Sequence, residues 1–312
     1  MIPQSAKPVL TKVAVPYPMP PAMNEDQREN HMAWAVKQGY PRIKYRPMTE
    51  QTMQIIAYGP SLADTWQDIN PDKPLITMSG SLKFLLEKGL KPRYGHWFHA
   101  HVDPRIDNLD VVVRHEKVIY LMGSCSHPKM FKMLEGMKVV LWHGLSGGHT
   151  KQWVAENDPG QVLVAAGSTI GLSSIHVGGV FGYRHFEIHG MDGSFKSDTR
   201  HAGPHGGIKH GQIPSVLNPD YMTSRLMDNA NVEIQAMLRN FPLFCVFHGD
   251  GVVQDWVGKA NMHNAARAGT PHADEVRTSK YEEVSIEEMR SLYRAGVPLI
   301  KDHVVAMANA GG

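Results

Sequence analysis

The chain has 312 residues, a hydrophobic fraction of 42% and a formal net charge of +2, which is the composition of an ordinary globular protein. The balanced charge gives no strong signal for nucleic acid, and no apolar run is long enough to cross a bilayer. The amino-terminal residues lack the apolar core of a secretory signal, and two cysteines are too few for a disulfide framework or a thiolate zinc site. We therefore expect a cytoplasmic protein without a membrane partner.

The first part of the chain, residues 1–50, is predicted to form a strap and a helix. Residues 1–22 are rich in proline, which fixes φ and removes amide donors, so they are predicted to run as an extended strap. Residues 24–38 are predicted to be helical, with Asn24 or Asp26 as the cap.

The central part, residues 51–252, alternates short apolar runs with helical segments. This alternation predicts a Rossmann-like α/β domain, in which helices cover both faces of a mostly parallel sheet. The predicted strands are 52–58, 74–78, 94–102, 117–122, 137–142, 161–166, 184–189 and 242–248. The predicted helices are 62–69, 80–90, 128–135, 169–181 and 218–239.

The last part, residues 253–312, is predicted to be a polar segment followed by a helical extension. Residues 254–282 are polar and show no periodicity. Ser285 and Glu288 form a capping box, which predicts that a terminal helix begins there. The strap and this polar segment are the expected surfaces of a homo-oligomer.

Two predicted strands end in small residues that suit a phosphate-bearing ligand. Ligands of open parallel sheets bind beyond the carboxyl ends of the strands. The first strand is followed by Gly59-Pro60-Ser61-Leu62, where glycine permits close backbone approach and Ser61 begins a helix whose free N–H groups attract anions. Gly167-Ser168-Thr169 repeats this pattern at a second helix start. The alternative is a pair of plain strand-to-helix turns.

Aspartates follow two other predicted strands. Asp103 and Asp192 stand where a side chain would hold a ribose hydroxyl, an acceptor or a divalent cation such as Mg²⁺. The alternative is that each residue caps a turn, since Asp-Pro and Asp-Gly are common turn pairs.

The chain contains eighteen histidines, several of them in HWFHAH (96–101) and HAGPHGGIKH (201–210). His201 and His205 lie in a long glycine-rich segment, from which a histidine can act as general acid or base. The alternatives are a solvated loop and a metal centre in a hydrolase. Within the first cluster, His99 is expected to pack in the core and His101 to face a pocket.

Three segments resemble the 6-hydroxymethylpterin diphosphokinase MptE-like family. They are AYGPSL, GSLKFLLEKGLKPRYGHWFHAHVDPR and AAGSTIGLSSIHVGGVFGYRHFEIHGMDGSF, and the likeness spans roughly residues 50–250. The family is related to motility accessory factors and to CMP-sialic acid-dependent sialyltransferases, and it includes phage-encoded proteins. The residues that match its pattern are Gly59, Pro60, Ser61, Asp103, Gly167, Ser168, Thr169 and Asp192.

The resemblance implies a nucleotide-dependent transferase with a Rossmann-like domain. Its donor would be a CMP-sugar or ATP/GTP, with Mg²⁺ in the second case, and it would move a sugar or a diphosphate to a small hydroxyl-bearing acceptor. The chain departs from the pattern at His248-Gly249-Asp250-Gly251, where relatives often have an Asn/Ser-rich turn, so the acceptor stays open. The rival hypotheses are a non-catalytic accessory protein that binds a nucleotide or sugar, and a histidine-metal hydrolase.

Overall fold

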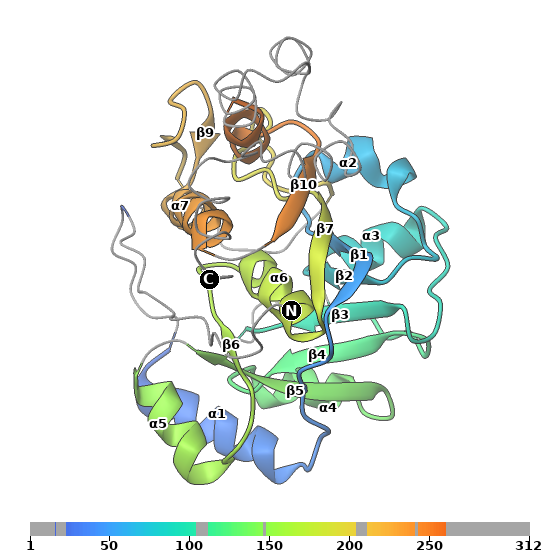
Figure 1. The fold of residues 1–312 in the computed structure, drawn as a ribbon, viewed down its shortest axis with the longest axis vertical. Helices are drawn as coiled ribbons and strands as arrows, with labels where there is room; N and C mark the ends of the chain where they lie inside the picture. Colours follow the sequence, from blue (N-terminus) through green and yellow to red (C-terminus); the bar gives the residue numbers. More distant parts are fainter. Residues whose placement is uncertain are drawn as a thin grey trace.

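The computed structural model describes Pro16 and residues 23–103, 112–145, 148–203, 211–240 and 243–259. Its centre is one eight-stranded sheet in the order β10-β7-β1-β2-β3-β4-β5-β6, and every neighbouring pair is parallel (Figure 1). The strands are β1 Thr49–Ile56, β2 Leu75–Met78, β3 Trp97–His101, β4 Ile119–Gly123, β5 Lys138–Leu145, β6 Leu163–Ala165, β7 Tyr183–His189 and β10 Phe244–His248. The predicted Rossmann-like α/β class is confirmed.

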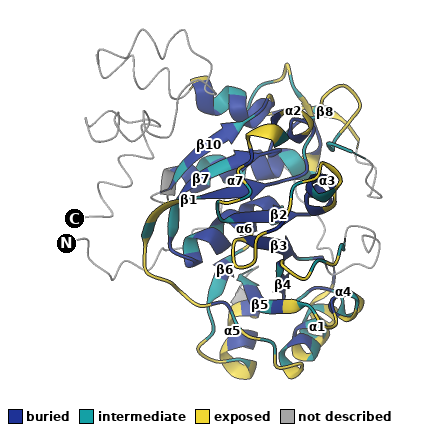
Figure 2. Ribbon diagram, turned by 90° about the vertical axis from the view of Figure 1, so that its right-hand side faces the viewer, coloured by how far each residue is buried: buried dark blue, intermediate teal, exposed yellow. Residues whose placement is uncertain are grey.

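Helices cover both faces of the sheet, and two apolar clusters pack between the helices and the sheet. The helices are α1 Glu25–Lys37, α2 Leu62–Thr65, α3 Ser81–Glu87, α4 Pro128–Met133, α5 Gly148–Asn157, α6 Ile170–Val180 and α7 Arg225–Asn240, with a 3₁₀ turn Trp66–Asp68 after α2. One cluster joins the sheet to α6 and α7, and the other joins it to α1, α3 and α4. Strands β2 and β3 are buried at every residue, as expected of strands covered on both faces (Figure 2).

The strand order reverses between β1 and β7. Strands β1 to β6 are added one after another on one side, whereas β7 returns to the other side of β1 and β10 follows beyond it. Helix α6 makes this return, and it packs against β7, β1, β2 and β3 on the way. In doubly wound sheets such a reversal opens a crevice at the carboxyl ends of the two strands.

Three features differ from the sequence-based expectations. Helix α5 was not predicted, because only a narrow part of it, around Trp153 and Val154, is apolar and buried. Helix α7 starts at Arg225 rather than near 218, because the preceding residues form the small hairpin β8 Ile213–Pro214 and β9 Met222–Thr223. Residues 252–259 are helical and bury Val252, Val253 and Val257, although the polar sequence predicted irregular structure from 254 onward.

The proline-rich strap and the predicted terminal helix lie outside the described residues, apart from Pro16. Along the described ranges, no helix combines the length and the apolar character that crossing a membrane requires.

Candidate functional site

The loops that follow β1 and β7 meet at the strand-order reversal. The Gly59 amide donates to the Gly190 carbonyl at 2.7 Å, so the two loops touch through their backbones. A Cβ on Gly59 would lie 2.5 Å from that carbonyl oxygen and 2.6 Å from Oδ2 of Asp192. Glycine at position 59 is therefore required by this close approach.

Asp192 binds the start of α2. Its Oδ2 accepts the Ser61 amide at 2.8 Å, and its Oδ1 accepts both the Ser61 hydroxyl and Nε2 of Gln254, the latter at 3.1 Å. The next amide, that of Leu62, donates to the Gly59 carbonyl. The Gly59-Pro60-Ser61-Leu62 turn thus directs its donors to groups of the protein itself, whereas the sequence predicted that they would face a phosphate.

Burial raises the pKa of Asp192 to about 6, although the hydrogen bonds from Ser61 and Gln254 lower it and nearby Asp250 raises it further. Lys196 lies at the edge of the crevice, where its Nζ binds Oδ2 of Asp64 at 2.7 Å. This ion pair raises the pKa of Lys196, and Asp250 and Asp192 add to the effect. The edge of the crevice therefore carries charges of both signs.

The amino end of α6 has unpaired backbone amides at the edge of the same crevice. Thr169 is extended and precedes the first helical turn, and its side chain makes no capping bond. Within the part of the chain that the structure describes, the amides of Ile170, Gly171 and Leu172 donate to no acceptor, and the first bonded amide is that of Ser173. Such unpaired amides carry the positive end of the helix dipole.

Contacts of Gly171 locate this helix end. A Cβ on Gly171 would lie 2.8 Å from Cε of Met191 and 3.7 Å from Sδ of Met78, the residues at the carboxyl ends of β7 and β2. The Gly167-Ser168-Thr169 segment therefore does come to the crevice, as its position before a helix predicted.

A second carboxylate, half-buried, flanks α6. The Ser168 amide donates to Oε2 of Glu233, a residue of α7, at 2.7 Å. Burial raises the pKa of Glu233, and its bonds with Ser168 oppose the shift. Glu233 and Gln254 had no signal in the sequence, because both lie in segments whose polar residues look like solvent-exposed ones.

Asp103 lies apart from Asp192. It follows β3, three strands from β7, which is about 14 Å at the usual strand spacing. The two aspartates therefore do not form a joint metal site, and both Asp192 oxygens already accept protein hydrogen bonds. Among the described residues no three His, Cys, Asp or Glu side chains gather as metal ligands.

The histidines of β3 face the core. His99 is buried and its Nδ1 lies 3.0 Å from the Thr77 hydroxyl, so the expectation that it packs in the core is confirmed. His101 is buried as well, with Nε2 2.7 Å from Sδ of Met130, and burial lowers its pKa to about 4. The expectation that His101 faces a pocket is wrong, because its side chain is buried against Met130 of α4.

His201 lies next to the first turn. Its ring stacks on Tyr58 at a centroid distance of 5.4 Å, and its Nδ1 is 3.3 Å from the Tyr58 carbonyl oxygen. The Ala202 amide donates to the same carbonyl at 3.1 Å, so this part of the glycine-rich loop is held against the end of β1. His205 lies outside the described residues.

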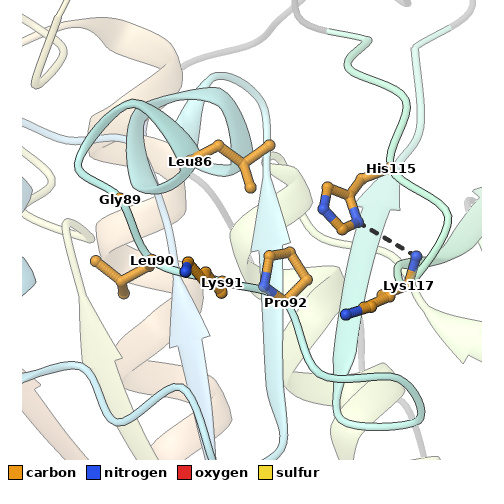
Figure 3. Close-up of a pocket in the computed structure, with 7 residues that line it drawn as sticks. All are labelled: Leu86, Gly89, Leu90, Lys91, Pro92, His115 and Lys117. Carbon is orange, nitrogen blue, oxygen red and sulfur yellow. Dashed lines mark hydrogen bonds between the residues drawn. The ribbon is translucent and has the colours of Figure 1, made fainter.

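A separate hollow of about 300 Å³ opens at the amino edge of the sheet (Figure 3). It is lined by Leu86, Gly89, Leu90, Lys91, Pro92, His115 and Lys117. Leu86 lies in the last turn of α3, and the other residues follow α3 or precede β4, so the hollow lies at the edge opposite to the crevice. In parallel sheets, ligand sites form at the carboxyl edge, so this hollow is not the candidate site.

The fold and the crevice define an α/β protein of Rossmann-like architecture with its candidate site at the strand-order reversal. The chain belongs to the MptE-like family, since the family described as 6-hydroxymethylpterin diphosphokinase MptE-like matches residues 29–198. No curated protein matches it by sequence.

Among solved structures the chain is similar to a MAf glycosyltransferase from Magnetospirillum magneticum AMB-1, with 12% identity and a TM-score of 0.53. The alignment covers 93% of this chain and 54% of the other, so the chain spans about half the length of that protein. At this identity the likeness shows the fold alone.

Proposed function

We propose that the protein is a nucleotide-dependent transferase that moves a diphosphate or a sugar from its donor to a hydroxyl acceptor. The observation that carries the proposal is the free amino end of α6, whose amides at Ile170, Gly171 and Leu172 lie at the strand-order reversal. Membership in the MptE-like family supports the same class of reaction.

We propose that the nucleotide phosphate binds at the amino end of α6. Unpaired amides and the helix dipole together favour an anion there, and the half-buried Thr169 side chain adds a hydroxyl. Gly167 and Ser168 lead the chain into this turn. The first turn, from Gly59 to Leu62, instead forms the floor of the crevice, and Asp192 holds it in place through Ser61.

Both candidate reactions release a nucleoside monophosphate. In diphosphate transfer the acceptor oxygen attacks the β-phosphorus, and the bond between that phosphorus and the oxygen of the α-phosphate breaks. In sugar transfer from a CMP-sugar the acceptor oxygen attacks the anomeric carbon, and CMP leaves with its phosphate oxygen. The departing phosphate gains negative charge in either case, and the amides of α6 would stabilise that charge.

His201 is the proposed proton acceptor. The attacking hydroxyl must lose its proton, and His201 is held beside the Tyr58 carbonyl at the edge of the crevice. An imidazole can take up this proton near neutral pH. His205 remains a second candidate from the same loop.

The test is a calorimetric binding panel of CMP, CDP, CTP, ATP, GTP and UDP, with and without Mg²⁺. Metal-independent preference for CMP would support sugar transfer, and Mg²⁺-dependent preference for ATP or GTP would support diphosphate transfer. A bound nucleotide at 100 times its dissociation constant should also add about 2.7 kcal/mol of stability in a parallel melt. If none of the six binds, the proposal is wrong.

A further inference from the structure

The hollow at the amino edge of the sheet has the size of a small-molecule site. Its volume of about 300 Å³ lies at the lower end of the range that such sites occupy. Leu86, Leu90 and Pro92 give the hollow an apolar wall, in which Pro92 is buried and the two leucines are half-buried. A wall of this kind can cover the apolar part of a ligand.

Three polar side chains line the same hollow, those of Lys91, His115 and Lys117. Both lysines are exposed, and within the described ranges neither ammonium group has a hydrogen bond or an ion pair. Glu87 and Glu116 are near them in the chain, but neither carboxylate lines the hollow. Two positive charges that border one hollow without an acidic neighbour in its wall repel each other and attract an anion.

His115 is fixed in this wall by its backbone and by one ring nitrogen. Its amide donates to the Tyr120 hydroxyl at 2.7 Å, and that hydroxyl donates to the Val113 carbonyl. Its Nδ1 accepts the Lys117 amide at 3.2 Å, so the neutral ring carries its proton on Nε2. Figure 3 shows this second nitrogen turned toward the apolar wall of the hollow. His115 therefore adds a positioned N–H donor to the two ammonium groups.

The turn that ends α3 occupies carbonyl oxygens that would otherwise repel an anion. The Leu90 amide donates to the Leu85 carbonyl, and the Gly89 amide donates to the Leu86 carbonyl. Gly89 has φ = +85°, which completes the left-handed C-terminal cap. The hollow beside this turn therefore offers a ligand hydrogen-bond donors and apolar surface.

We propose that this hollow binds a phosphate monoester that carries an apolar body. Such a phosphate has a charge of about −1.5 to −2 at neutral pH, which matches the two ammonium groups of Lys91 and Lys117. Its oxygens are acceptors for the Nε2–H group of His115, and its apolar body covers the wall of the hollow. The hollow lies at the sheet edge opposite to the crevice, so this site does not depend on the proposed function.

The test is a calorimetric titration of the full chain with phenyl phosphate, inorganic phosphate, benzoate and benzyl alcohol at low salt. We expect phenyl phosphate to bind about tenfold or more tightly than inorganic phosphate, which lacks the apolar body, and than benzyl alcohol, which lacks the charge. Benzoate has a single charge and should bind more weakly than phenyl phosphate. Roughly 1 M salt should weaken the binding of phenyl phosphate, because the Debye length is then only about 3 Å.

Two double variants locate the binding. Lys91→Gln combined with Lys117→Gln removes both charges of the hollow, and Lys44→Gln combined with Lys151→Gln removes two exposed lysines elsewhere. We expect the first pair to weaken phenyl phosphate binding about tenfold at low salt and the second pair to leave it unchanged. All four side chains are exposed, so the Tm of both double variants should stay close to that of wild type.

Three results would overturn the inference. Equal affinity of wild type and the variant without Lys91 and Lys117 would place the ligand elsewhere on the molecule. Binding of inorganic phosphate, benzoate or benzyl alcohol as tightly as phenyl phosphate would contradict the chemistry of the site. The third result is a wild-type protein that does not bind phenyl phosphate.

Discussion

Asp192 and Ser61 are 131 residues apart in the chain, yet Oδ2 of Asp192 accepts the Ser61 amide at 2.8 Å. This contact exists because β7 returns to the side of β1, so that their carboxyl ends are neighbours. It joins the two loops in addition to the backbone bond from the Gly59 amide to the Gly190 carbonyl. The buried carboxylate is therefore an organising group of the crevice.

Asp192 should make stability depend on pH. Its folded pKa of about 6 lies above its ordinary value of 3.8, so the folded protein binds this proton more tightly than the unfolded chain. The resulting stability is fully present below about pH 4 and is lost as pH rises through about 6. In Asp192→Asn this loss is absent, so the Tm of the variant minus that of wild type should increase between pH 4 and pH 7.5. Calorimetric melts across this range measure it.

Asp68→Asn is the control for that experiment, since Asp68 is exposed. A Tm difference for Asp192→Asn that stays constant with pH would show that the carboxylate titrates normally.

Gly59→Ala should disturb the floor of the crevice. The added methyl group would lie 2.5 Å from the Gly190 carbonyl oxygen, and backbone cannot move aside as a side chain can. We expect a loss of about 1–3 kcal/mol, the usual cost of overpacking, together with weaker nucleotide binding. Gly211→Ala is the matched control, because a Cβ placed at Gly211 would have no atom of the described residues within 4 Å apart from its chain neighbours. Equal denaturation midpoints for the two variants would contradict the close approach.

Glu233→Gln should strengthen nucleotide binding. The carboxylate accepts the Ser168 amide beside the free end of α6, so its negative charge opposes a bound phosphate. Glutamine keeps an acceptor for that amide without the charge. We expect the dissociation constant to fall by about threefold to tenfold at low salt, and less at high salt. Weaker binding would mean that the Glu233 carboxylate itself contacts the ligand.

Two substitutions separate the roles of His201. His201→Phe keeps an aromatic ring to stack on Tyr58, whereas His201→Ala removes both the ring and the titratable group. If the imidazole accepts the proton, turnover should fall about 10²–10⁴-fold in both variants. Steady-state kinetics with the donor found in the binding panel provide the measurement. Activity restored by phenylalanine would assign His201 a packing role alone.

Much of this arrangement follows from the sequence pattern, and the rest depends on strand order. Small residues and aspartates at the ends of apolar runs predicted which loops lie at the carboxyl edge. The pattern did not say that β7 pairs with β1, so the bond between Asp192 and Ser61 could not be foreseen. It also did not show that α6 spans the sheet, which brings Gly171 beside Met78 and Met191.

The partners of these loops escaped prediction for a different reason. Gln254 and Glu233 contact the crevice from segments that look like ordinary solvent-facing stretches. The burial of Gln254 and the partial burial of Glu233 result from tertiary packing, which periodicity along one segment does not record. His101 was misassigned because its burial depends on Met130 of a neighbouring helix.

Phosphate binding at α6 is tested most directly by Ile170→Pro, at the first position of that helix. Proline is favoured there and lacks the amide that would bind phosphate, and the extended Thr169 before it is compatible with proline. The substitution also removes part of the Ile170 side chain, which packs against the core. Glu25→Pro, at the same position of α1, is the control. Calorimetry should show the tightest-binding nucleotide weakened about tenfold or more in Ile170→Pro alone, while its Tm falls only slightly because of the lost Ile170 packing. Equal affinity in Ile170→Pro and wild type would contradict phosphate binding at α6.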